Sequence, residues 1–263
     1  MAEKVKLIDV AKCTGCRGCQ LACKQWNQLP ARQTTAAGTY QNPPDLQPNT
    51  WTLIRFQEVV EKEGVKWLFR KDGCMHCTNA ACVKVCPSGA LYHSDLGTVG
   101  IIKERCIGCK ECVAACPFEI PRYDSVTDKV YKCDLCLSRI RADLPPACVK
   151  ACPTGALTFG DKGDMLKLAY KRAGELGGDA SVYGDKFVDG THVLYVLQEK
   201  PGVYDVLPVK PHVPLSVMAW KDLLKPLSLV VAGGVLAASF LHYIIHGPKT
   251  PDEDDNHKTE GGA

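Results

Sequence analysis

Sixteen cysteines, arranged in four groups of four, constrain this chain of 263 residues more than any other feature. The most complete group begins at Cys106 and reads Cys-Ile-Gly-Cys-Lys-Glu-Cys-Val-Ala-Ala-Cys-Pro, a spacing of C-x2-C-x2-C-x3-C-P. Three thiolates two residues apart can surround one inorganic cluster only if the backbone curls over it, and Gly108 stands where that turn needs a residue without a side chain. Such a run predicts ligands for a [4Fe–4S] cluster.

The other three groups repeat this arrangement with variations. The first group has the same spacing and places Gly15 where Gly108 stands, but Lys24 replaces the closing proline. The second group has four residues between its second and third cysteines, and the fourth group has eleven. In chain order the groups are Cys13, Cys16, Cys19, Cys23; Cys74, Cys77, Cys82, Cys86; Cys106, Cys109, Cys112, Cys116; and Cys133, Cys136, Cys148, Cys152. At four ligands each, they predict four [4Fe–4S] clusters with no cysteine left over.

Two other uses of many cysteines fit this pattern less well. Disulfide frameworks space their cysteines irregularly, and zinc sites use C-x2-C pairs rather than runs of three. Here two groups carry three cysteines at x2 spacing, and three groups end in C-x3-C-P. We therefore expect iron–sulfur clusters, with a colourless zinc protein as the alternative from a different class.

The second and fourth groups share an internal repeat. Cys82 begins Cys-Val-Lys-Val-Cys-Pro-Ser-Gly-Ala-Leu, and Cys148 begins Cys-Val-Lys-Ala-Cys-Pro-Thr-Gly-Ala-Leu. The order A-B-A′-B′ predicts duplicated two-cluster units, in which each group gives its last cysteine to the partner cluster. Spacing leaves two pairings open: groups one with two and three with four, or two with three nested inside one with four.

Residues 24–73 form an insertion between the first two groups. Its first half is rich in Gln, Asn, Pro and Thr and predicts surface loop, whereas its second half predicts a hairpin around Glu63-Gly64. Four aromatic residues are expected in the core of this hairpin: Trp51, Phe56, Trp67 and Phe69.

Residues 161–177 have helical periodicity, and their apolar stripe is expected to pack against the cysteine-bearing domain. The stripe consists of Leu166, Ala169, Tyr170 and Ala173. A strand is expected from Thr191, and the proline-rich residues 201–214 predict an extended linker over the surface. No Walker or G-x-G-x-x-G loop occurs, so nothing supports nucleotide or flavin binding.

Residues 227–245 are nineteen residues without a formal charge. As a helix they would cover roughly 28 Å, close to the hydrocarbon thickness of a bilayer. We therefore predict a transmembrane helix, with Trp220 and Lys225 before it, Tyr243 near its end and Lys249 after it as interfacial anchors. Lysine counts on the two sides are too similar to predict an orientation.

The two ends of the chain and its charge add further expectations. Residues 246–263 form a short acidic tail, and Met1 to Asp9 contain no apolar run of a signal peptide. A formal net charge of +3 gives no reason to expect nucleic acid. No nucleophile–base pair, open metal site or substrate cavity is recognisable, so we expect an electron conduit without a catalytic site.

Four further segments give the chain a specific resemblance. They are Arg70-Lys-Asp-Gly-Cys-Met-His-Cys77, Val130-Tyr-Lys-Cys-Asp-Leu-Cys136, Leu224-Lys-Pro-Leu227 and His242-Tyr-Ile-Ile-His-Gly-Pro248. With them the chain resembles, over essentially its whole length, the β (iron–sulfur) subunit of respiratory membrane-bound formate dehydrogenase. That family belongs to the electron-transfer subunits of molybdopterin oxidoreductases.

The resemblance implies the nested pairing and an α+β fold: two ferredoxin-like double-[4Fe–4S] modules with an inserted hairpin, plus one C-terminal transmembrane helix. The implied ligand sets are Cys13, Cys16, Cys19 with Cys152; Cys133, Cys136, Cys148 with Cys23; Cys74, Cys77, Cys82 with Cys116; and Cys106, Cys109, Cys112 with Cys86. The implied domains are residues 1–23 with 117–160 (outer module), 24–73 (insertion), 74–116 (inner module), 161–226 (extension and linker), 227–245 (membrane helix) and 246–263 (tail).

The resemblance also implies partners and a location. Electrons would come from a catalytic α subunit that oxidises formate at a molybdenum- or tungsten-bis-pterin centre and would pass to a cytochrome b γ subunit that reduces quinone. The heterotrimer would lie in the cell inner membrane with its globular part in the periplasm. The alternative is the same role for another molybdopterin oxidoreductase or for a hydrogenase.

Overall fold

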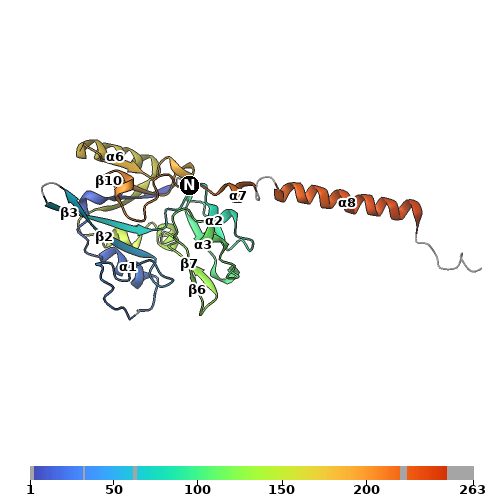
Figure 1. The fold of residues 1–263 in the computed structure, drawn as a ribbon, viewed down its shortest axis with the longest axis horizontal. Helices are drawn as coiled ribbons and strands as arrows, with labels where there is room; N and C mark the ends of the chain where they lie inside the picture. Colours follow the sequence, from blue (N-terminus) through green and yellow to red (C-terminus); the bar gives the residue numbers. More distant parts are fainter. Residues whose placement is uncertain (1–2, 32, 62–63, 220–223, 248–263) are drawn as a thin grey trace, which may run out of the picture. The chain divides into compact units, whose positions relative to one another are not determined.

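The computed structural model describes residues 3–31, 33–61, 64–219 and 224–247. The chain divides into two compact units, Met1–Val217 and Met218–Ala263, which are described separately (Figure 1). The first unit carries all sixteen cysteines and mixes short helices with four small sheets. The second unit carries one long helix.

A four-stranded sheet forms the centre of the first unit, in the order β8-β1-β10-β9. Its strands are β1 (Lys4–Asp9), β8 (Leu157–Asp161), β9 (Ser181–Tyr183) and β10 (Val193–Leu197). β1 pairs with β10 in parallel and with β8 antiparallel, so the strand before the first cysteine group lies beside the strand after the last. β1 continues into the 3-10 helix η1 (Val10–Lys12), which leads directly to Cys13.

The helix α6 (Lys162–Leu176) covers one face of this sheet (Figure 1). Ala169 is completely buried, and Leu166 and Ala173 pack beside it against Val5, Leu7 and the apolar side chains of β10. The helix predicted over 161–177 and most of its stripe are therefore confirmed. Tyr170 was wrongly included in that stripe, because it is half exposed and its hydroxyl donates to Asp185.

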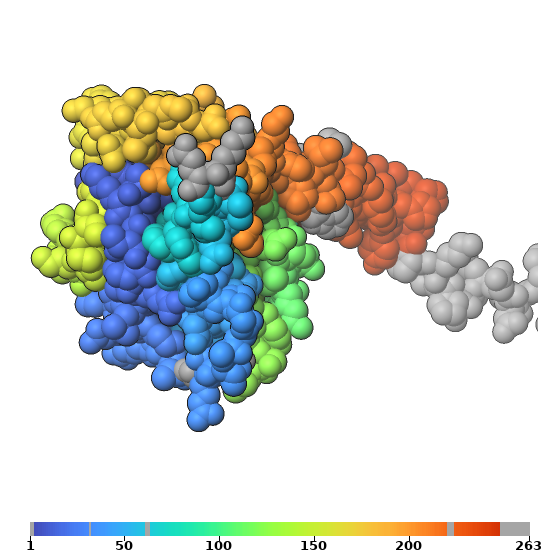
Figure 2. Space-filling view, turned by 60° about the vertical axis from the view of Figure 1, so that its left-hand side comes forward, coloured from blue at the N-terminus to red at the C-terminus, as the bar shows by residue number. Residues whose placement is uncertain are grey.

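The insertion contains two long strands, β2 (Thr52–Glu61) and β3 (Gly64–Gly73), which pair antiparallel with Phe56 opposite Phe69. Glu63, at the expected turn, lies outside the described residues. Figure 2 shows this pair, in light blue to cyan, beside the blue N-terminal segment. Trp51 is buried against cysteines of the first and fourth groups, whereas Trp67 is 37% exposed and was wrongly placed in the core.

Short helices hold the cysteine groups. They are α1 (Gly18–Trp26), α2 (Ala81–Lys84), α3 (Glu111–Ala115), α4 (Leu137–Arg141) and α5 (Ala147–Lys150). α1 packs against α5, and α2 packs against α3. Two small antiparallel pairs, β4 (Leu91–His93) with β5 (Val99–Ile101) and β6 (Arg122–Asp124) with β7 (Lys129–Tyr131), connect successive groups. The remaining 3-10 helices are η2 (Lys103–Arg105), η3 (Phe187–Asp189) and η4 (Pro201–Val203).

Residues 201–214 do not behave as the surface linker that their prolines predict. Tyr204, Leu207 and Val213 are buried in the main apolar core, and the Tyr204 hydroxyl accepts hydrogen bonds from two backbone N–H groups. The segment begins with a turn of 3-10 helix and is held by these side chains, so proline-rich composition predicted neither its local helix nor its contacts with the core. A short helix, α7 (Leu215–Met218), follows.

The helix α8 (Lys225–His246) has 22 residues and a mean hydropathy of 1.9, and none of its side chains is buried. Its length is roughly 33 Å at the α-helical rise. Among the described residues it is the one helix long and apolar enough to span a bilayer, and it contains the predicted span. Trp220, Lys249 and the acidic tail beyond Gly247 lie outside the described residues.

Candidate iron–sulfur sites

All four cysteine groups make the same turn. The residue immediately before the second cysteine of each group has a left-handed backbone, and these residues are Gly15 (φ 68°), His76 (φ 50°), Gly108 (φ 67°) and Leu135 (φ 60°). A Cβ on Gly108 would lie 2.2 Å from Oδ1 of Asp128, so the glycine predicted from the sequence is required. His76 and Leu135 adopt the turn at a cost of about 1–3 kcal/mol each.

The third cysteine of each group lies on a short helix, namely Cys19 on α1, Cys82 on α2, Cys112 on α3 and Cys148 on α5. The fourth cysteine lies one helical turn later, at or just beyond the helix end in three of the groups. Each helix pair therefore brings the cysteines of two groups together. α1 with α5 joins groups one and four, and α2 with α3 joins groups two and three.

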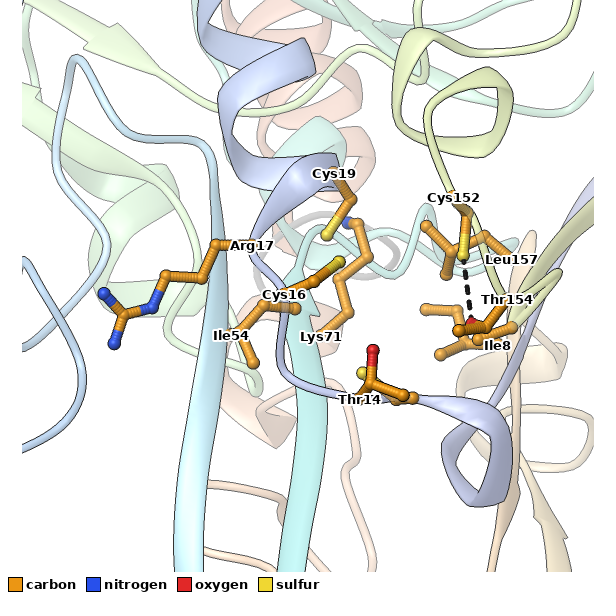
Figure 3. A pocket seen from close by; sticks show the side chains of 12 residues that line it. Ile8, Thr14, Cys16, Arg17, Cys19, Ile54, Lys71, Cys152, Thr154 and Leu157 are labelled. Carbon is orange, nitrogen blue, oxygen red and sulfur yellow. Dashed lines mark hydrogen bonds between the residues drawn. The ribbon is translucent and has the colours of Figure 1, made fainter.

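Four thiols line one hollow beside β1 and β3. They belong to Cys13, Cys16, Cys19 and Cys152, and the apolar walls come from Ile8, Ile54, Ala156 and Leu157. Figure 3 shows Cys16, Cys19 and Cys152 around this hollow, with the side chain of Lys71 entering between them. The guanidinium of Arg17 points away from the thiols and lies over the ring of Phe56.

The remaining thiols gather in three further places, as their mutual electrostatics show. Burial raises the pKa of Cys23 to about 12, and the charges of Cys133 and Cys148 add to it. Burial raises the pKa of Cys136, with Cys133 and Cys148 contributing again. Burial also raises the pKa of Cys77, and the neighbouring thiols of Cys74, Cys116 and Cys82 add to it. Burial raises the pKa of Cys112 to about 12, and the neighbouring thiols of Cys109, Cys86 and Cys106 add to it.

Charge interactions connect each of the four gatherings to the next, in the order first to fourth. Cys19 of the hollow influences Cys148 of the second gathering, and Cys133 of the second is influenced by Cys74 of the third. Cys82 of the third is influenced in turn by Cys112 of the fourth. Cys16 and Cys109, at opposite ends of this order, are the two cysteines that are exposed to solvent.

The spacing of the thiols distinguishes between the possible inorganic groups. A single zinc ion holds its sulfurs at about 2.3 Å, which would bring them within roughly 4 Å of one another. In the part of the chain that the structure describes, no three His, Cys, Asp or Glu side chains are close enough to share one ion. Four thiols that line one hollow with apolar walls fit a four-iron cluster, in which each thiolate binds a different iron.

Buried cations accompany the thiols, and sequence reasoning missed them. Lys6, Lys71 and Lys132 are each at most 2% exposed. Burial alone would lower the pKa of Lys71, but the negative charges of Cys148, Cys19 and Cys133 outweigh it and raise the pKa. Lysine is rarely buried, so the residue type alone predicts a solvent-exposed side chain. The one available signal was that Lys71 and Lys132 stand close in sequence to cysteine groups.

The fold and these sites define a class of protein: a multi-cluster iron–sulfur protein of the kind that transfers electrons. Two sequence families, both described as "4Fe-4S dicluster domain", match residues 12–90 and 65–162. A third family, "Formate dehydrogenase N, transmembrane", matches residues 213–256.

The chain is 44% identical to the formate dehydrogenase iron-sulfur subunit of Haemophilus influenzae, over 98% of this chain and 85% of that protein. It is 45% identical to two Escherichia coli proteins, the formate dehydrogenase-O iron-sulfur subunit and the iron-sulfur subunit of the nitrate-inducible formate dehydrogenase. These matches cover 98% of this chain and 88% and 91% of the relatives. The chain belongs to the family of formate dehydrogenase iron-sulfur subunits, as the sequence resemblance predicted. It carries four [4Fe–4S] clusters and transfers electrons within a formate dehydrogenase complex.

Proposed function

We propose that this chain connects two partner subunits. One oxidises formate at a molybdenum- or tungsten-bis-pterin centre, and the other is a membrane cytochrome b that reduces quinone. The observation that carries this proposal is the order of the four thiol gatherings, which has one exposed cysteine at each end. A bound [4Fe–4S] cluster accepts and releases one electron at a time. The chain's own residues hold such clusters in sequence, and the two exposed ends suit docking of two different partners.

The proposed ligand sets follow the gatherings. The first set is Cys13, Cys16, Cys19 and Cys152; the second is Cys23, Cys133, Cys136 and Cys148; the third is Cys74, Cys77, Cys82 and Cys116; and the fourth is Cys86, Cys106, Cys109 and Cys112. The packing of α1 on α5 and of α2 on α3 supports them, because it favours the nested pairing over the sequential one. The hollow that the first four thiols line supports the first set independently.

The proposed domain plan follows the same nesting. An outer ferredoxin-like module combines residues 1–23 with 117–160 and encloses an inner module at 74–116. The β2–β3 hairpin belongs to the insertion at 24–73, which also supplies Lys71 and Trp51 next to the outer thiols. In this plan the chain has no catalytic site of its own, and its side chains hold and tune clusters only.

The proposed location is the cell inner membrane, with α8 crossing it once and the globular part in the periplasm. Support comes from the length and apolar character of α8 and from the match of residues 213–256 to a formate dehydrogenase transmembrane family. Truncation before Leu227 should release the globular part from membranes or weaken its attachment, which carbonate washing and sedimentation would measure. Unchanged, detergent-requiring attachment would mean that α8 is not the anchor.

The proposed function is tested by low-temperature EPR of anaerobic membranes before and after formate is added. We expect new signals from several interacting reduced clusters, and their absence from a strain that lacks this chain. If dithionite reduced the clusters but formate did not, the electron-transfer role would still stand, but formate would not be the electron donor of this complex. A second molybdopterin oxidoreductase or a hydrogenase would then be sought among the co-purifying subunits.

A further inference from the structure

Lys71 is a buried cation beside the cysteine thiols. It lies on β3 with 2% of its surface exposed, and its Nζ donates to Oγ1 of Thr52 at 3.2 Å. Among the described residues no carboxylate forms an ion pair with it. The adjacent Asp72 is engaged by Arg55 at 2.8 Å and by Arg70 at 3.4 Å.

The groups that face Lys71 are cysteine thiols of two different gatherings. Its side chain enters the hollow lined by Cys13, Cys16, Cys19 and Cys152 (Figure 3). Its charge also interacts with Cys148 and Cys133, which belong to the second gathering. Lys71 therefore stands between the first and second ligand sets. The charge of Lys6 also acts on the second set, because it interacts with Cys133.

Burial of a charge without a partner costs several kcal/mol in a protein interior. The chain nevertheless places the ammonium of Lys71 in a hollow with apolar walls, where a neutral side chain of the same length would avoid that cost. The negative charge that balances it must therefore come from the thiolate-bound iron–sulfur groups. Lys132 provides a comparison, because it is equally buried and its charge acts on Cys82 of the third set. Its Nζ also donates to the backbone carbonyl of Cys133 in the second set, at 2.9 Å, but it does not line the hollow of the first set.

We infer that Lys71 is a fixed counter-charge shared by the first and second cluster sets, which raises the reduction potentials of both. An electron that arrives at either set makes it one unit more negative, and no proton is taken up or released. The nearby ammonium stabilises that added charge, and it does so for donor and acceptor set alike. The inference rests on the ligand sets proposed above.

The test is a potentiometric titration of the purified complex with chemical mediators, followed by EPR. In Lys71→Met, which keeps the length of the side chain but removes its charge, two midpoint potentials should fall. The oxidised-to-reduced equilibrium of each should change at least tenfold, which is about 59 mV for one electron. The other two potentials should stay. Lys132→Met, the buried comparison, should lower the potential of the third set and leave that of the first set in place.

Lys71→Arg keeps the charge and should keep the wild-type potentials. If the arginine variant shifted as far as the methionine variant, packing rather than charge would be responsible and the inference would be overturned. Unchanged potentials in Lys71→Met, or an equal shift of all four, would overturn it as well. If Lys71→Met lost iron from two sets while Lys71→Arg retained it, the charge would be needed to hold those sets, which supports the inference. Because chemical mediators replace formate in this titration, its result can be interpreted even if formate is not the electron donor.

Discussion

The four cysteine groups form two pairs, which use the same turns but stabilise them differently. The outer pair, groups one and four, is joined to the central sheet through η1 and β8 and is crossed by the insertion, whose Lys71 enters its hollow. The inner pair, groups two and three, has only short helices and two small strands of its own, β4 and β5. Its turn at His76 is held by its own β5, where the N–H of Val99 donates to Nδ1 of His76, and its turn at Gly108 is closed by Asp128, which lies outside the pair.

This difference shows how one motif can be placed in two environments. The spacing of the cysteines fixes the local turn, whereas the cations and strands packed around it differ from pair to pair. The environment of each cluster tunes its potential through hydrogen bonds, charge and burial. The outer and inner pairs can therefore differ in potential although their ligands are identical.

The strongest test removes one exposed cysteine from each end. Cys109→Ser in the inner pair and Cys16→Ser in the outer pair should each convert or remove one cluster and abolish almost all formate-to-quinone electron transfer. Formate oxidation with an artificial acceptor that takes electrons upstream should survive in both. Rapid-freeze EPR after formate should then separate them, because only the variant that has lost the exit end keeps three formate-reducible clusters.

Two outcomes of this comparison of Cys16→Ser with Cys109→Ser would contradict the proposed path. If both variants retained formate-reducible clusters to the same extent, Cys16 and Cys109 would not mark opposite ends of one path. Loss of artificial-acceptor activity in an intact complex would argue against the conduit role itself. Iron content and subunit composition are the controls, since a complex that falls apart answers neither question.

Alanine substitutions in the glycine turns should give the next largest effect, a loss of folding stability. Alanine at Gly108 would meet the backbone oxygen of Asp128 at 2.7 Å, whereas at Gly15 it would meet the ring edge of Phe56 at 2.9 Å. Gly155 has a similar φ of +64° but nothing within 4 Å of its Cβ, so Gly155→Ala isolates the backbone strain. We expect Gly108→Ala to be less stable than Gly155→Ala by about 1–3 kcal/mol, the usual cost of overpacking.

Thermal unfolding of the detergent-solubilised complex, with iron per chain as a second readout, measures this order. Gly15→Ala should fall between the other two, because a ring can shift where a backbone carbonyl cannot. Equal losses in all three variants would mean that left-handed φ alone sets the cost and that the outer and inner turns do not differ in their packing.

The sequence predicted the parts of this fold that depend on local pattern. Cysteine spacing predicted the turns and the need for Gly15 and Gly108, and periodicity predicted α6. Pairing of the groups could not be read from spacing, because it depends on which short helices meet, and α1 meets α5 across more than a hundred residues of chain. Long-range packing also decided the burial of Lys71, since its residue type predicts exposure.

Burial was predicted wrongly at the edges of the domain for the same reason. Tyr204, Leu207 and Val213 occur in a proline-rich stretch, yet the core has room for their side chains and buries them. Tyr170 has the helical spacing of a buried residue, but it lies at the margin of the α6 face, where Asp185 takes its hydroxyl. A local pattern identifies the element and its direction, and the neighbouring elements determine which side chains are buried.

The smallest expected effect concerns the contact between the insertion and the strand that follows group three. Asp45 forms ion pairs with Arg55 of β2 at 2.5 Å and with Arg122 of β6 at 2.6 Å. Burial alone would raise the pKa of Asp45, but the hydrogen bond from Arg55, the Leu46 backbone and the charge of Arg122 together lower it. Because its carboxylate is 52% exposed, solvent screening limits the stabilisation to about 1 kcal/mol.

A lowered folded-state pKa means that this stabilisation is present above the unfolded pKa, near 3.9 for aspartate, and is lost as the pH falls through the folded value. Asp45→Asn should therefore be less stable than wild type at pH 7 by about 1 kcal/mol or less, and the difference should shrink toward pH 3. Asp143→Asn, at an exposed aspartate without an ion pair among the described residues, is the control. A difference that stays constant from neutral to acid pH would assign the loss of stability to packing rather than to the charge of Asp45.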